Sequence, residues 1–175
     1  MVKPVKFAHM VLDTNNYEAM VEWYSTFLDA EVRHGDEYLT FLSYDDEHHR
    51  IAIVNRAQHD RVPGSCGLAH VAYTYAGVDD LFALYRRLGA VGIRPVRTIH
   101  HGMTLSAYYA DPDGNGVETQ VDVLSMDEAE AFMRSDVFRA NPIGILVDFD
   151  DLIERHAAGD PTVTDYPQVE TSTPG

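Results

Sequence analysis

The alternation of apolar and polar residues predicts the same order of secondary structure twice along the chain. The first copy begins with a strand over 5–12, where apolar residues alternate with others. A helix follows, because Asn15 and Glu18 have the spacing of a capping box and apolar side chains then recur every three or four positions as far as Leu28. Three short strands complete this copy, and we expect them at about 31–34, 38–44 and 50–55.

The second copy starts after a predicted linker at 56–66, which contains Pro63, Gly64 and Ser65. It repeats the order of one strand, one helix and three strands, expected at 67–75, 79–88, 94–99, 104–110 and 116–124. Each copy is therefore a βαβββ module, the first at about 5–56 and the second at about 67–124. This order predicts an α+β fold class.

Residues 125–175 predict a C-terminal helical extension and a tail. A helix is expected from a capping box of Ser125 and Glu128 to about residue 140, and a second short helix at 148–156. The polar, proline-containing tail that follows should be extended or mobile. The length fits a single domain over 1–175 that buries a sizeable core.

The segment from Asp111 to Asn115 predicts a tight turn between two paired strands. Its proline fixes one backbone angle, and its glycine and asparagine tolerate positive φ. Alternation in the flanking strands separates apolar from polar positions, and it places Tyr108 and Glu118 on polar faces. We expect these two faces to line one concavity that contains both side chains.

Composition excludes several classes of function. The chain has 28 acidic and 13 basic residues and a formal charge of −15, so we expect it to be repelled by nucleic acid and by anionic membranes. No apolar run reaches transmembrane length, and the start lacks a secretory signal, which predicts a cytoplasmic protein. The single cysteine, Cys66, excludes an intrachain disulfide and a cysteine-rich metal site.

Three residues form a candidate metal site. His9 and His70 lie near the middle of the first strand of each module, and Glu118 follows the tight turn in the last strand of the second. A lone histidine in a strand is more often a hydrogen-bonded core residue, and a lone glutamate usually faces solvent. Two imidazoles at equivalent positions together with a carboxylate favour a facial triad, which binds Fe(II) or Mn(II) and leaves one side open to substrate and dioxygen.

His9, His70 and Glu118 in a doubled βαβββ chain resemble the vicinal oxygen chelate superfamily over about residues 5–124. This resemblance implies that the paired modules form a cupped mixed sheet around a divalent metal. The triad alone does not choose among the dioxygenases, glyoxalases, epimerases and antibiotic-modifying enzymes of the superfamily.

Further residues resemble the one-domain type I extradiol ring-cleaving dioxygenases. His49 matches the place of their acid/base histidine, and Tyr108 matches a tyrosine that binds the substrate oxygen. Either His100 or His101 matches another active-site histidine, and the spacing to Tyr108 does not choose between them. The resemblance implies an Fe(II) enzyme of aromatic hydrocarbon catabolism, which opens catechol or a compound like 2,3-dihydroxybiphenyl with O2. We also expect a homo-oligomer.

Other functions stay open at this point. A thiol transferase of the fosfomycin-resistance type shares the His, His, Glu set, although His49 and Tyr108 argue against it. A glyoxalase or an epimerase would need a fourth protein ligand, for which Gln120 would have to point into the cup. A metal-free drug-binding protein of the bleomycin-resistance type has no need of a histidine in both modules.

Overall fold

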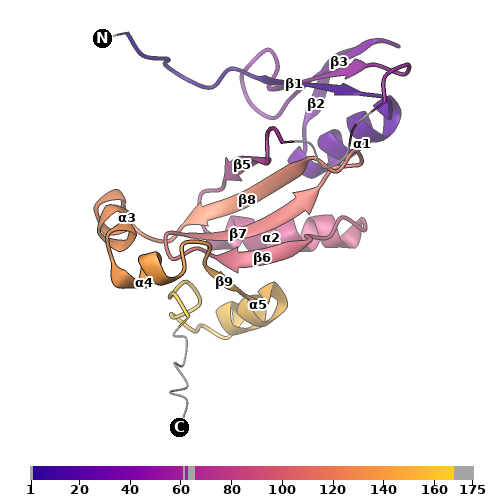
Figure 1. Cartoon of the computed structure of the whole chain (residues 1–175). Coiled ribbons are helices and arrows are strands. Elements are labelled where there is room, and N and C mark those ends of the chain that lie inside the picture. Colours follow the sequence, from indigo (N-terminus) through magenta and orange to yellow (C-terminus); the bar gives the residue numbers. More distant parts are fainter. Residues whose placement is uncertain (1, 61, 63–65, 168–175) are drawn as a thin grey trace. The chain divides into compact units, whose positions relative to one another are not determined.

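The computed structural model describes residues 2–60, 62 and 66–167, which form two compact units. Unit 1 comprises the described residues up to Ala69 together with the turn at 110–116, and unit 2 comprises residues 70–109 and those from 117 onward. Each unit contains one βαβββ module, as the sequence predicts. Figure 1 shows both units and labels their elements where there is room.

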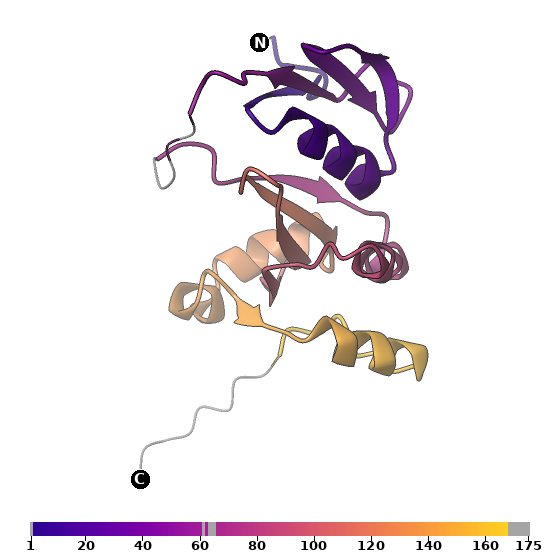
Figure 2. The same cartoon turned by 90° about the vertical axis from the view of Figure 1, so that its right-hand side faces the viewer.

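Unit 1 is a four-stranded mixed sheet with one helix packed on it. Its elements are β1 (Met10–Thr14), α1 (Tyr17–Leu28), β2 (Glu31–Gly35), β3 (Leu39–Ser43) and β4 (Ile51–Asn55). The strand order is β1-β4-β3-β2, with β1 parallel to β4 and the other pairs antiparallel. Figure 2 shows α1 along one face of this sheet. The core between helix and sheet contains Met20, Tyr24, Phe27, Leu42, Ile51 and Ile53.

Two details of this unit differ from the sequence prediction. The first strand begins at Met10, so His9 lies immediately before it. The prediction of a capping box formed by Asn15 and Glu18 is wrong, because the N-cap of α1 is Asn16 and no side chain caps the helix. The Asn15 amide instead donates to the carbonyl of His59 at 3.0 Å.

Unit 2 contains a five-stranded sheet, in the order β5-β8-β7-β6-β9. Its elements are β5 (His70–Thr74), α2 (Val78–Ala90), β6 (Arg97–His100), β7 (Thr104–Ala110), β8 (Gly116–Asp122), α3 (Met126–Met133), α4 (Asp136–Ala140), β9 (Ile145–Leu146) and α5 (Phe149–Ala157). The apolar stripe of α2 and the alternating apolar residues of the strands form its core, which includes Leu81, Leu84, Leu88, Leu105, Val117 and Val121.

The C-terminal extension is more structured than the sequence predicts. The capping box of Ser125 and Glu128 is confirmed. The prediction of a single helix to residue 140 is wrong, because α3 ends at Met133 and Ser135 caps a separate helix, α4. The extension also adds β9, which pairs with β6. The tail prediction is wrong as far as residue 167, because Val163 is only 4% exposed and 161–165 form turns, while 168–175 lie outside the described residues.

The predicted tight turn is confirmed and belongs to unit 1. Asp111 is buried, and one of its carboxylate oxygens accepts from the backbone amides of Asp113 and Asn115 at 3.0 and 2.8 Å. The other oxygen accepts from the side-chain amide of Asn115 and from the Tyr24 hydroxyl. Gly114 has φ of +78°, which explains the glycine at this position.

Within the described part of the chain, no helix is long and apolar enough to cross a membrane.

Candidate active site

His70 and Glu118 meet in unit 2. Alternation in β5 exposes His70 and turns the next residue, Val71, toward the half-buried side of the strand. On β8, Val117 packs into the core and Glu118 lies on the opposite face. His70 Nε2 and Glu118 Oε2 are 3.0 Å apart, although Glu118 is only 4% exposed. The exposed His70 ring therefore gives the buried Glu118 carboxylate a polar partner.

The spacing of this pair fits two ligands of one metal ion. Nitrogen and oxygen ligands lie about 2.1 Å from small divalent ions, so two ligands at a right angle are about 3 Å apart. The distance between His70 Nε2 and Glu118 Oε2 has this value. Across the described residues, no group of three or more His, Cys, Asp or Glu side chains is arranged to hold a metal ion. The third predicted ligand, His9, belongs to unit 1.

Tyr108 joins the same cluster from β7. Its hydroxyl lies 2.8 Å from His101 Nε2, and the Glu118 carboxylate is close enough to act on it electrostatically. A phenol hydroxyl both donates and accepts, so its proton can point toward the carboxylate while its oxygen accepts from His101 Nε2. Burial and the nearby Glu118 charge raise the pKa of Tyr108 strongly. The residue is therefore a neutral phenol with an available proton at physiological pH.

Arg97 is a member of this cluster that sequence reasoning missed. Its guanidinium carbon lies 4.5 Å from the centre of the Tyr108 ring, and the two residues are register partners on β6 and β7. The positive charge opposes the rise in the pKa of Tyr108. Alternation assigns each residue a face of its own strand, but it does not give the register that places Arg97 opposite Tyr108.

His100 and His101 differ sharply in their surroundings. His100 is buried, its Nδ1 accepts from the Gly102 amide at 3.0 Å, and its Nε2 donates to the Thr164 carbonyl at 2.9 Å. Burial lowers the pKa of His100, which favours this neutral tautomer. Both ring nitrogens of His100 thus bind backbone groups, whereas His101 directs one nitrogen to Tyr108. The geometry favours His101 as the residue that can act on a ligand.

His49 lies in a group of rings in unit 1. Its imidazole stacks on Phe41 with centres 4.2 Å apart and planes at 10°, and it lies 4.4 Å from the His9 ring. His48 Nδ1 is 2.6 Å from His49 Nδ1. Burial and the neighbouring His9 and His48 lower the pKa of His49, so the ring is mainly neutral at pH 7. Sequence reasoning missed Phe41, which only the β3–β4 pairing brings beside this segment.

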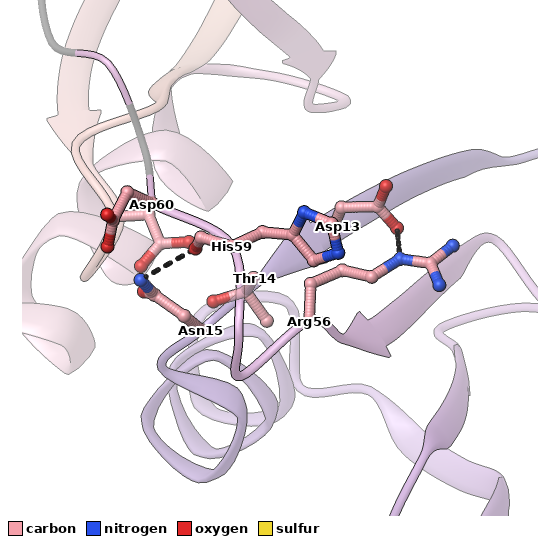
Figure 3. Close-up of a pocket in the computed structure, with 7 residues that line it drawn as sticks. Asp13, Thr14, Asn15, Arg56, His59 and Asp60 are labelled. Atoms are coloured by element: carbon pink, nitrogen blue, oxygen red, sulfur yellow. Dashed lines mark hydrogen bonds and ion pairs between the residues drawn. The ribbon is translucent and has the colours of Figure 1, made fainter.

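A polar cavity of about 470 Å³ also lies in unit 1 (Figure 3). Arg56 donates to Asp13, and the Asn15 amide donates to the His59 carbonyl, so several of its polar groups already have partners. None of the predicted site residues lines it. The lining suits a small polar molecule better than an aromatic ring.

Comparisons with known proteins agree with the resemblance seen in the sequence. The protein-family model of the Glyoxalase/Bleomycin resistance protein/Dioxygenase superfamily matches residues 6–119. Biphenyl-2,3-diol 1,2-dioxygenase 2 of Rhodococcus globerulus is 45% identical over 151 residues, which cover 85% of this chain and 80% of that protein. Biphenyl-2,3-diol 1,2-dioxygenase 3 of the same organism is 38% identical over 160 residues, covering 89% and 84%.

Solved structures share the fold at lower identity. Lactoylglutathione lyase from Agrobacterium tumefaciens has a TM-score of 0.54 and 16% identity, covering 67% of this chain and 94% of that one. A glyoxalase/bleomycin resistance protein/dioxygenase from Nocardioides has a TM-score of 0.56 and 18% identity, covering 70% and 86%. The family model, the two relatives and the shared fold all support the same family assignment. The chain belongs to the Glyoxalase/Bleomycin resistance protein/Dioxygenase superfamily.

Proposed function

We propose that the protein is an extradiol ring-cleaving dioxygenase, which opens a catechol-type aromatic ring with O2. The observation that carries this proposal is the cluster in which the Tyr108 hydroxyl binds His101 and lies close to Glu118 and His70. A glyoxalase or a thiol transferase has no evident use for a neutral phenol next to the metal ligands. The identity to two proteins named as biphenyl-2,3-diol dioxygenases supports a catechol with a bulky substituent as the substrate.

His70 and Glu118 are the proposed iron ligands in unit 2, and His9 is the proposed third ligand. The 3.0 Å spacing of His70 and Glu118 supports the first two. His9 is supported by its place at the first strand of its module, which corresponds to the place of His70, and by family membership. Fe(II), when bound, would supply the redox chemistry that lets O2 react with the catechol. Mn(II) suits the same donor set.

Tyr108 and His101 would orient the substrate. A phenol that keeps its proton can donate a hydrogen bond to one deprotonated catechol oxygen. His101 Nε2 donates to the Tyr108 oxygen and holds that hydroxyl in one direction. This arrangement would position one substrate oxygen, with the proton staying on Tyr108, and the hydrogen bond to that oxygen would assist ketonisation of the product.

His49 is the proposed acid/base residue. A neutral imidazole can take the proton of a catechol hydroxyl and later return it to an oxygen of the opening ring. Its support is the family resemblance, together with the stacking on Phe41 that fixes the plane of the ring. Phe7 and Val11 are exposed apolar side chains near His9, and they are the proposed wall for the aromatic ring in unit 1.

The test is to load the purified protein anaerobically with Fe(II), add 2,3-dihydroxybiphenyl or catechol, and then admit air. We expect a yellow ring-fission product, with faster turnover of 2,3-dihydroxybiphenyl. Absence of this product with every catechol tested, while iron analysis shows bound metal, would contradict the proposal. Light scattering on the same sample tests the expected homo-oligomer.

A further inference from the structure

We propose that the C-terminal extension is a clamp that positions His101 against Tyr108. The clamp consists of Phe132, Gly144 and the segment 164–166, all of which contact the turn His100–Gly102. The superfamily match ends at residue 119, so it assigns nothing to this extension. The proposal rests on the proposed function for its catalytic meaning, whereas the contacts themselves stand independently of it.

Phe132 of α3 covers the turn from one side. A Cβ atom built on Gly102 would lie 2.1 Å from the tip of the Phe132 ring, and Gly102 has φ of +86°. Only glycine combines this backbone conformation with space for the ring. The close approach of Phe132 therefore restricts the backbone next to His101.

Gly144 provides the second contact, just before β9. A Cβ atom built on Gly144 would lie 2.4 Å from the His100 carbonyl oxygen and 2.8 Å from the His101 Cα. The strand that follows pairs Ile145 with His100 and Leu146 with Ile99. The extension thus meets the turn backbone to backbone, and any larger residue at 144 would push the two segments apart.

The segment 164–166 provides the third contact. The Thr164 carbonyl accepts from His100 Nε2 at 2.9 Å, and the Tyr166 ring packs edge-on against His100 at 5.4 Å. Tyr166 also contacts Phe132 at 5.5 Å, which links the two parts of the clamp. His100 passes this restraint to the turn, because its Nδ1 accepts from the Gly102 amide.

These contacts restrain the backbone on both sides of His101, at His100 and at Gly102. The His101 ring remains free to contact Tyr108. The His101 amide donates to the Thr104 carbonyl at 2.8 Å, which closes the turn. His100 and Phe132 are therefore positioning residues, since they act on Tyr108 only through His101. A shift of about 1 Å in a catalytic group costs up to about 100-fold in rate, so loosening the clamp should slow turnover.

The first experiment compares Phe132→Ala with Met133→Ala, the next residue of the same helix, which is 44% exposed. In the iron-loaded enzyme, Phe132→Ala should lower kcat by about 10- to 100-fold while KM and iron content change less than about twofold. Phe132→Leu, which keeps apolar volume at the site, should recover part of the loss. Met133→Ala should leave kcat within about twofold of the unsubstituted enzyme.

A double-mutant cycle with His101→Gln shows whether Phe132 acts through His101. In the His101→Gln background, the further Phe132→Ala change should lower kcat by less than about twofold, because the group that it positions is absent. An equal loss of kcat in both backgrounds would overturn the proposal, since Phe132 would then act on overall stability or on another group.

The second experiment needs no iron and no activity. Amide hydrogen exchange in the metal-free protein should show a protected Gly102 amide, whose exchange becomes at least about tenfold faster in Phe132→Ala and Phe132→Leu but not in Met133→Ala. Unchanged Gly102 exchange in both Phe132 variants would overturn the clamp. Faster exchange in a protein that cleaves no catechol would support the clamp and contradict only the ring cleavage.

Discussion

The two units hold their candidate site residues by different means. In unit 2, His70, Tyr108 and Glu118 lie within strands β5, β7 and β8, where ladder hydrogen bonds fix each backbone. In unit 1, His9 precedes β1 and His49 precedes β4. Ring contacts hold the His49 side chain, chiefly the stacking on Phe41 at 4.2 Å. Strand register therefore places the groups of unit 2, and side-chain packing places those of unit 1.

This difference also divides the chemistry. Unit 2 contains a buried carboxylate, a neutral phenol and a hydrogen-bonded histidine, which are suited to binding a cation and orienting a substrate. Unit 1 contains an imidazole whose pKa is lowered, which is suited to exchanging a proton. Variants of Glu118 and Tyr108 in unit 2 should change metal binding and substrate geometry, whereas variants of His49 in unit 1 should change turnover without loss of metal.

The largest expected effect is that of Glu118→Gln. The substitution removes the charge of a proposed iron ligand. Mutation of a residue that only hydrogen-bonds to a ligand costs about 10- to 100-fold in metal affinity, so the loss here should exceed about 100-fold. Ring cleavage should become undetectable. Iron analysis after dialysis measures the effect. Gln120→Ala, two residues along the same face, serves as the control and should retain iron. Full iron content in Glu118→Gln would show that the carboxylate is not a ligand.

His49→Ala should retain iron and lose turnover. Removal of a general acid/base lowers kcat by about 100- to 10,000-fold, whereas a residue that is not a ligand leaves metal content unchanged. Steady-state oxygen uptake and iron analysis on one sample separate the two effects. His34→Ala replaces an exposed histidine of the same unit and should leave both values near those of the unsubstituted enzyme. Loss of iron from His49→Ala would mean that His49 is itself a ligand.

Tyr108→Phe should lower kcat by about 10- to 100-fold with iron retained. The change removes only the hydroxyl, so it leaves His101 Nε2 without its hydrogen-bond partner. Thermal unfolding should show a loss of about 1 kcal/mol from this bond. Tyr38→Phe, in unit 1, is the matched control. An unchanged kcat in Tyr108→Phe would remove Tyr108 from the reaction and would weaken the choice of ring cleavage over other metal chemistry.

Phe41→Leu tests the role of stacking in unit 1. The ring contact with His49 is worth about 0.5–1.5 kcal/mol, so its loss should lower kcat by about 2- to 10-fold if that energy positions the imidazole. Phe41→Tyr keeps the ring and should retain more activity. Repeating Phe41→Leu in the His49→Ala background provides the check, because the substitution should then have no further effect on the residual rate.

Local pattern in the sequence predicted the groups that strands position. Alternation placed Tyr108 and Glu118 on polar faces, and the structure brings the two side chains close enough to interact electrostatically. The sequence also predicted the turn between them, and Gly114 has the positive φ expected there. Such features depend on neighbours within a few residues, which is the range over which alternation and turn chemistry act.

Other features depend on partners far away in the sequence. The choice between His100 and His101 follows from the Thr164 carbonyl, which occupies His100 and leaves His101 to Tyr108. The stacking of Phe41 on His49 depends in the same way on how two strands pair. No local pattern contains these contacts, because spacing along the chain does not encode the register between strands.

The smallest expected effect concerns the pH dependence of stability that His100 contributes. Burial lowers the pKa of folded His100 below its ordinary value of 6.5, so the unfolded chain binds the proton first as the pH falls. The contribution of His100 to stability should therefore be fully present above pH 6.5 and decline below it. Comparison of Tm at pH 7.5 and 5.5 should show a smaller decline in His100→Gln than in the unsubstituted protein, by about 3 °C or less. His34→Gln, which replaces an exposed histidine, is the control variant. An identical decline in the His100→Gln and unsubstituted proteins would mean that His100 does not titrate differently on folding.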